Sequence, residues 1–134
     1  MIVPYRSFPG PQGMVYRPII EVKLISRTRS VSTWALLDSG SDSTLINKQI
    51  GKQLGIDYKS CSIGSAQGIA GPSQKTWKAE IDIEVDGFPG NPKRARVQFI
   101  DLANVGILLG HVGFFEFFDV RFRTSRNQFE IDLA

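Results

Sequence analysis

The alternation of apolar and polar residues predicts that the first half of the chain is mostly β-structure. In residues 20–26 the apolar side chains alternate with charged ones, which is typical of a half-buried strand. A second strand is expected over residues 31–37, which end in an apolar run. Asn47 is a good helix cap, so we expect a short helix that begins there, runs to Gln53 and ends at Gly55.

The second half repeats this pattern with longer strands and glycine-rich or proline-rich turns. The expected strands are residues 58–67, 73–85, 96–102, 107–110, 120–122 and 129–133. Phenylalanines spread around residues 111–117 predict one or two helical turns. The pattern as a whole predicts an all-β fold with one or two short helices and a C-terminal β-hairpin.

The N-terminal residues follow a different pattern. Pro4, Pro9, Gly10, Pro11 and Gly13 predict an extended arm over residues 1–16 in place of a regular element. The chain has 134 residues, which suits a single domain, and we expect it to span residues 17–134.

Charge and cysteine content exclude several classes of function. The 16 Lys and Arg against 13 Asp and Glu give a net charge of only +3, and the basic residues 93–96 alternate with apolar positions, so a solvated strand face is favoured over a nucleic-acid site. Cys61 has no second cysteine to pair with and is interpreted as a packing residue. We find no membrane-spanning stretch and no signal-peptide core, and we expect a cytoplasmic protein without metal or cofactor.

The most informative motif is Asp38-Ser39-Gly40, directly after the apolar run of residues 34–37. An ionised carboxylate at the end of a buried strand is costly unless it is hydrogen-bonded or used in chemistry. A bare Asp-Ser-Gly is also found in ordinary turns, so the triplet alone leaves both interpretations open.

Two further motifs in the same order narrow the choice. A glycine-flanked hairpin tip spans residues 68–71, and residues 107–110 read Ile-Leu-Leu-Gly. With Leu36-Leu37-Asp38-Ser39-Gly40, these motifs resemble a retropepsin-like aspartic protease of the cellular or bacterial type, over residues 17 to about 119. The resemblance implies the acid protease barrel, equivalent to one lobe of pepsin.

The resemblance also implies a reaction and an assembly. Such proteases cleave peptide bonds with two aspartates that share one proton, and one of the pair activates a water. This sequence contains a single Asp-Ser/Thr-Gly triplet. A homodimer with twofold symmetry would place a second Asp38 opposite the first.

The resemblance assigns roles residue by residue. Asp38 is the catalytic residue, Ser39 hydrogen-bonds across the dimer axis, and the Gly40 backbone approaches the carboxylates. Residues 64–77 form a flap over the bound peptide, and Ile69 presents its backbone amide. The expected substrate-binding residues are Leu36, Asp42, Gly68, Ile69, Ala70, Val105 and Leu108, and the expected supports of the site are Leu109, Gly110 and His111.

The sequence departs from the retroviral pattern at position 111 and at its C-terminus. Retroviral members usually have Arg after the glycine, paired with the acidic residue four positions beyond the catalytic Asp, whereas this chain has His111 and Asp42. A His111–Asp42 contact and a merely packed or surface histidine are equally compatible with the sequence. Residues 120–133 extend beyond the position at which retroviral members usually end. The resemblance therefore does not assign the strands that form the dimer interface.

Two alternatives to a protease remain at this stage. One is a catalytically silent module of the same fold that binds peptides or dimerises. The other is an unrelated β-barrel binding domain with Asp38 in a turn, for which the order of the three motifs would be a coincidence.

Overall fold

The computed structural model describes residues 1–67, 71–102 and 106–134, and these residues are nearly all β-structure. The helical elements in this part of the chain are the α-helix α1 (Lys48–Gln53) and the short 3-10 helices η1 (Tyr58–Ser60) and η2 (Thr124–Arg126). The strands are β1 (Ile2–Pro4), β2 (Arg6–Gly10), β3 (Gly13–Arg17), β4 (Ile19–Ile25), β5 (Ser30–Leu37), β6 (Thr44–Asn47), β7 (Ser62–Ala66), β8 (Gln74–Val85), β9 (Lys93–Ile100), β10 (Ile107–Leu109), β11 (Phe118–Arg123) and β12 (Gln128–Leu133).

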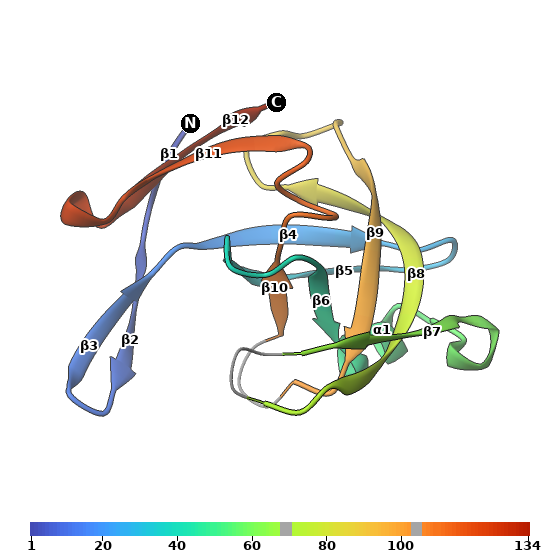
Figure 1. The fold of residues 1–134 in the computed structure, drawn as a ribbon. Helices are drawn as coiled ribbons and strands as arrows, with labels where there is room; N and C mark the ends of the chain where they lie inside the picture. The colour runs from blue at the N-terminus through green and yellow to red at the C-terminus, as the bar shows by residue number, and fades with distance from the viewer. Residues whose placement is uncertain (68–70, 103–105) are drawn as a thin grey trace.

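Six strands close into a barrel in the order β4-β5-β10-β6-β9-β8, because β4 also pairs with β8. β7 lies outside the barrel and pairs only with β8. β10 runs parallel to β5 and antiparallel to β6, while β6 runs parallel to β9 (Figure 1). This arrangement confirms the expected all-β fold built around a barrel.

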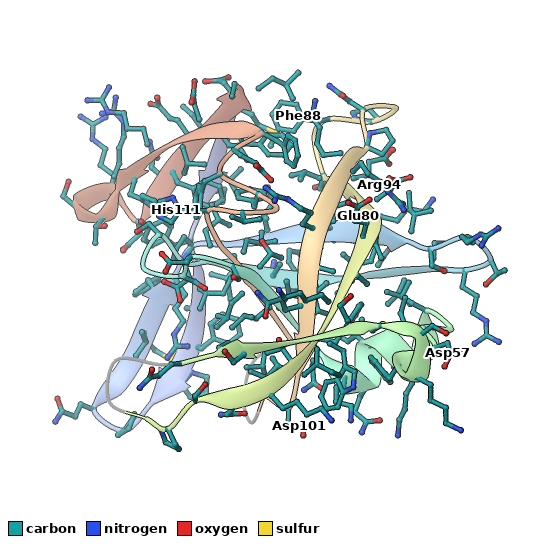
Figure 2. All side chains as sticks on the ribbon, turned by 45° about the vertical axis from the view of Figure 1, so that its right-hand side comes forward. Asp57, Glu80, Phe88, Arg94, Asp101 and His111 are labelled. Atoms are coloured by element: carbon teal, nitrogen blue, oxygen red, sulfur yellow. The ribbon has the colours of Figure 1, made fainter. Side chains whose placement is uncertain are left out.

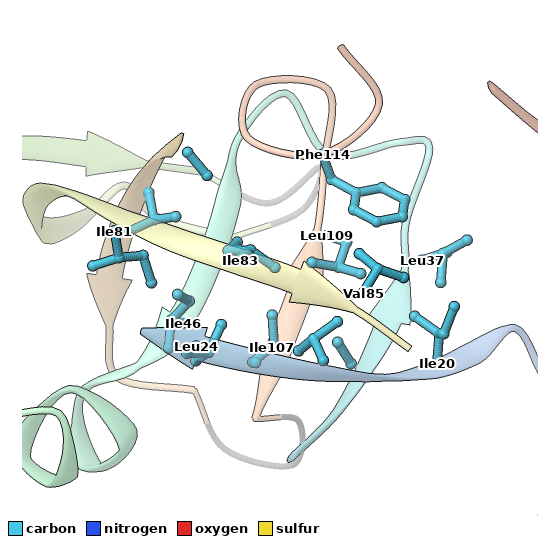
Figure 3. Packing of buried hydrophobic residues seen from close by; sticks show 14 of the residues in the cluster. Ile20, Leu24, Leu37, Ile46, Ile81, Ile83, Val85, Ile107, Leu109 and Phe114 are labelled. Atoms are coloured by element: carbon cyan, nitrogen blue, oxygen red, sulfur yellow. The ribbon is translucent and has the colours of Figure 1, made fainter. Parts of the chain in front are cut away.

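The barrel interior is filled by the apolar positions of the alternating strands. Ile81, Ile83 and Val85 of β8 are almost fully buried and lie close to Leu24, Ile107 and Leu109 (Figure 3). Burying one such aliphatic side chain contributes about 1.5–3 kcal/mol. The period-two pattern therefore determines which face of each strand points inward.

The N-terminal residues differ from the expected irregular arm. β1 pairs with β12 to form a separate sheet in the order β1-β12-β11, and β2 and β3 form a two-stranded hairpin. The prolines that suggested an arm are compatible with these positions, since β1 is an edge strand and β2 pairs on one side only. The hairpin extends away from the barrel (Figure 1).

The first predicted helix and the closing hairpin are confirmed, and the second helix is wrong. α1 begins after Asn47, whose side chain accepts a hydrogen bond from the Gln49 amide, and β11 and β12 form the C-terminal hairpin. Residues 111–117 form consecutive turns. Gly113 has a φ of +100°, a left-handed conformation that interrupts a right-handed helix.

The basic segment of β9 is a solvated strand face, as expected. The Arg94 guanidinium lies 3.6 Å from the Glu80 carboxylate and 3.5 Å from that of Asp82, both on β8 (Figure 2). Exposed pairs of this kind contribute little to stability. Across the described ranges, none of the helices has the length and apolar character needed to cross a membrane.

Candidate active site

Asp38 is positioned by two neighbouring strands of the barrel. It follows the last residue of β5, and β10 lies alongside, with Leu37 opposite Leu109. The Asp38 amide donates a hydrogen bond to the Leu109 carbonyl at 2.9 Å. The predicted support by Leu109 is therefore a backbone contact, and it holds Asp38 at the point where β5 ends.

A tight turn after β5 directs the carboxylate. The Gly40 amide donates to Asp38 Oδ1 at 3.0 Å, and the Ser41 amide donates to the Asp38 carbonyl at 3.1 Å. Asp38 is half-buried, whereas Ser39 and Gly40 are exposed. The carboxylate thus has a hydrogen-bond donor from its own loop and still reaches the surface, which avoids the cost of full burial.

Thr44 joins the loop after Asp38 to the segment after β10, and the sequence analysis missed it. Its side chain is fully buried, and its Oγ1 donates to the Val112 carbonyl at 2.9 Å and accepts from the Gly110 amide at 3.1 Å. A hydroxyl residue six positions after an aspartate has no chemistry of its own. Its role follows from the tertiary contacts alone.

Gly110 is a close-packing position. A Cβ atom there would lie 2.6 Å from the Ser41 carbonyl oxygen and would collide with the Ser43 carbonyl. The backbone of residues 41–43 therefore packs directly on Gly110. Any larger residue would push this loop, and with it Asp38, out of place.

His111 contacts the Asp38 loop, but its ring hydrogen-bonds to a backbone carbonyl and not to the Asp42 carboxylate considered above. Its Nε2 lies 2.7 Å from the Ser39 carbonyl oxygen, which only accepts hydrogen bonds, so Nε2 is the donor. Asp42 is joined to this segment through backbone only, because its carbonyl accepts from the Val112 amide. The histidine is exposed and lies beside the Phe115 ring (Figure 2).

An open groove of about 700 Å³ begins at this loop. Asp38, Gly40, Asp42 and Leu108, for which the sequence analysis expects catalytic or binding roles, are among the residues that line it. The β7–β8 hairpin contributes Ser65, Ala66 and Gln67 at the start of its tip, together with Ser73 and Gln74. The groove thus runs between the Asp38 loop and the hairpin that the sequence marked as a flap.

The remaining predicted binding residues are placed as follows. Leu36 is half-buried between Ile19 and Leu108 in the sheet and does not line this groove in the single chain. Gly68, Ile69, Ala70 and Val105 lie outside the described residues. Ile100 and Leu102, which the sequence analysis did not select, add apolar surface to the groove.

The described residues offer no metal centre and no activated thiol. In the ranges 1–67, 71–102 and 106–134, no three His, Cys, Asp or Glu side chains gather as a possible metal site. Burial and, secondarily, the nearby Asp57 raise the pKa of the Cys61 thiol above its ordinary value. A thiol with a raised pKa is a poor nucleophile, which agrees with a packing role for Cys61.

Comparisons with known proteins bear on this arrangement. The sequence profile of the family described as aspartyl protease matches residues 26–110, from the end of β4 to the glycine after β10. No curated protein matches the chain significantly.

Two solved structures share the fold. A retropepsin-like aspartic protease from Rickettsia conorii has a TM-score of 0.65 at 15% identity, and the match covers 98% of this chain and 97% of that one. The EIAV protease in complex with the inhibitor HBY-793 has a TM-score of 0.51 at 20% identity, over 71% of this chain and 82% of that one. At these identities the likeness shows the fold alone.

Proposed function

The chain belongs to the aspartyl protease family, and we propose that it is an aspartic endopeptidase that acts as a homodimer. The observation that carries the proposal is the setting of Asp38. Asp38 is half-buried, its carboxylate accepts a hydrogen bond from the Gly40 amide, and it lines an open groove of about 700 Å³ that extends to the β7–β8 hairpin. A protein that only needed this fold would have no physical reason to keep a carboxylate there.

The proposed reaction needs two carboxylates. One Asp38 takes a proton from water while the water oxygen bonds to the peptide carbonyl carbon, and the protonated Asp38 of the second copy donates its proton to the carbonyl oxygen. The first Asp38 then gives the proton it took from water to the amide nitrogen, the C–N bond breaks, and a hydroxyl of the tetrahedral intermediate returns a proton to the second Asp38 as the carbonyl re-forms. Two ionised Asp38 carboxylates side by side would repel each other, so the pair would titrate as a unit.

The second carboxylate would come from a second copy of the chain, because the sequence has one Asp-Ser/Thr-Gly triplet. A twofold axis beside Asp38 would bring Ser39 of each copy close to the other. Asp38 is half-buried, and the loop residues Ser39 and Gly40 that follow it are exposed.

We assign part of the dimer surface to the β2–β3 hairpin. Phe8, Met14 and Tyr16 are 38%, 58% and 51% exposed on a two-stranded hairpin, which is marginal in water without further cover. Its root lies next to the active site, since the Pro18 carbonyl accepts from the Leu37 amide. The chain ends are already paired with each other in the β1-β12-β11 sheet, so this hairpin is the free N-terminal element.

The β7–β8 hairpin would act as the flap. Residues 64–77 would close over the peptide, with Gly68, Ile69 and Ala70 at the tip and Ile69 donating its amide. Leu36, Val105 and Leu108 would provide apolar pockets for the side chains of a peptide that binds as an added strand. His111 would hold the loop through the Ser39 carbonyl.

The test compares wild type with Asp38→Asn on a mixed peptide library from acidic to neutral pH. Asp119→Asn, an exposed aspartate on β11, is the matched control and should keep full activity. We expect cleavage in the wild type and the control and its loss in Asp38→Asn. Cleavage that survives Asp38→Asn, or none from a proven dimer, would overturn the assignment and leave the silent peptide-binding module.

A further inference from the structure

Three polar side chains form a continuous hydrogen-bonded chain from β8 to the loop after Asp38. Thr76 Oγ1 on β8 donates to Gln98 Oε1 on β9. Gln98 Nε2 donates to Ser43 Oγ at 3.0 Å. Thr76 is fully buried, and Gln98 and Ser43 are half-buried. We refer to these residues as the Thr76–Gln98–Ser43 chain.

The Thr76–Gln98–Ser43 chain joins the two sides of the groove. Ser43 lines the groove together with Asp38, and the Ser43 carbonyl accepts a hydrogen bond from Ser41 Oγ at 2.7 Å. Thr76 lies two residues beyond Gln74, which lines the groove on the side of the β7–β8 hairpin. Gln98 does not line the groove, so it would act through its two neighbours and not on a peptide directly.

The β7–β8 hairpin is packed tightly on this chain. Gly64 of β7 lies opposite Thr76 of β8. A Cβ atom at Gly64 would lie 2.8 Å from Thr76 Oγ1 and 3.3 Å from Gln98 Oε1. The root of the hairpin therefore rests on the Thr76–Gln98 hydrogen bond, and a displacement of one requires a displacement of the other.

A polar residue at position 98 is not needed for the barrel itself. Val97 and Phe99 on either side are buried and apolar, and β9 is already hydrogen-bonded to β6 and β8 through its backbone. A partly buried amide is costly unless its hydrogen bonds are made, and here both of its ends are satisfied. The side chain thus has a fixed orientation that the fold alone does not demand.

We propose that Gln98 is a positioning residue that fixes the root of the β7–β8 hairpin relative to the Asp38 loop. Held in this way, the two sides of the groove keep their separation when a peptide enters. The proposal rests on the proposed protease function for its kinetic consequence. Its structural consequence, a fixed position of the hairpin root relative to the Asp38 loop, does not depend on peptide hydrolysis. The proposed protease function and the proposal for Gln98 can therefore fail separately.

The kinetic test uses Gln98→Met, which keeps the length of the side chain and removes both hydrogen bonds. We expect KM to rise about threefold or more, because each of the two lost hydrogen bonds corresponds to about a two- to tenfold change, with a smaller change in kcat. Thr76→Val should have a similar effect, and the double variant should be no worse than either single one, because each breaks the same chain. Gln128→Met, at a half-buried strand position outside the barrel, is the control and should leave KM unchanged.

The second measurement is amide hydrogen exchange on the full chain. Gln98→Met should speed exchange in β7 and at Gly40 and Ser41, and should leave the β11–β12 hairpin unchanged. If the wild type hydrolyses no peptide but Gln98→Met still shows this exchange pattern, the proposed protease function is wrong and the proposal for Gln98 stands. Unchanged exchange at both sites, or a loss of stability with KM unchanged and additive effects in the double variant, would overturn the proposal.

Discussion

Replacing Thr44 by valine tests how strongly the Asp38 loop depends on one buried hydroxyl. Valine keeps the shape of threonine, so no cavity forms, but both hydrogen bonds of Thr44 Oγ1 are lost. The Gly110 amide, which is buried, then has no acceptor at this position. An unsatisfied buried donor costs about 1–3 kcal/mol, and the second lost hydrogen bond costs about 0.5–1.5 kcal/mol.

These terms predict that Thr44→Val lowers the free energy of unfolding by about 1.5–4.5 kcal/mol. Urea denaturation measures the loss, and with a slope of about 2 kcal/mol per molar urea the midpoint should fall by about 1–2 M. Thr44→Ser keeps the hydroxyl and should recover most of the stability. Thr33→Val, on the half-buried part of β5, is the control and should change stability by less than about 0.5 kcal/mol.

A Thr44→Val protein as stable as the Thr33→Val control would show that the Thr44 hydrogen bonds contribute nothing measurable to stability. A Thr44→Ser protein as unstable as Thr44→Val would lead to the same conclusion, because restoring the hydroxyl would then restore no stability. Because Gly110 and Val112 flank His111, which holds Ser39, Thr44→Val should also lower peptide hydrolysis more than its stability loss explains.

Three further predictions concern packing, titration and assembly. Gly110→Ala should destabilise the fold by about 3 kcal/mol or more in urea denaturation, because its Cβ would collide with backbone that has no room to move, and a neutral effect would contradict the packing. Burial, with smaller contributions from Cys61 and Asp101, raises the pKa of Tyr58 to about 12. Since the folded pKa exceeds the ordinary value of 10.0, stability should be full below that pH and decline as pH rises from there to about 12, and Tyr58→Phe should remove the decline in alkaline unfolding curves. Replacing Phe8 and Tyr16 together by serine should weaken the proposed dimer at least tenfold in sedimentation without lowering the melting temperature of the monomer, whereas equal association would remove the β2–β3 hairpin from the interface.

Much of the barrel could be predicted because the alternation of apolar and polar residues within a strand indicates which of its faces is buried. Ile81, Ile83 and Val85 alternate with charged residues, and the structure buries these three while their neighbours face outward. Asn47 indicated the start of α1, because its side chain accepts a hydrogen bond from the nearby Gln49 amide. Such signals depend on residues close together in sequence, so they can be read without knowing the fold.

The errors fall where local and long-range preferences compete. The prolines and glycines of residues 1–16 are poor strand formers, yet β1 gains a partner in β12 from the far end of the chain. The phenylalanines of residues 111–117 suggested a helix, but Gly113 takes a positive φ and Phe114 is buried in the core. In both cases a distant contact decided the local conformation.

The amino-acid pattern alone was enough to predict most strands of the barrel, α1 and the position of Asp38 at a strand end. Only the tertiary structure decided what surrounds Asp38: the insertion of β10 between β5 and β6, the Thr44 hydrogen bonds, His111 on Ser39, and the chain through Gln98. The physical reason is separation along the chain. Thr44 and Gly110 are 66 residues apart, and Ser43 and Gln98 are 55 apart, so neither pairing leaves a periodic signal in the sequence.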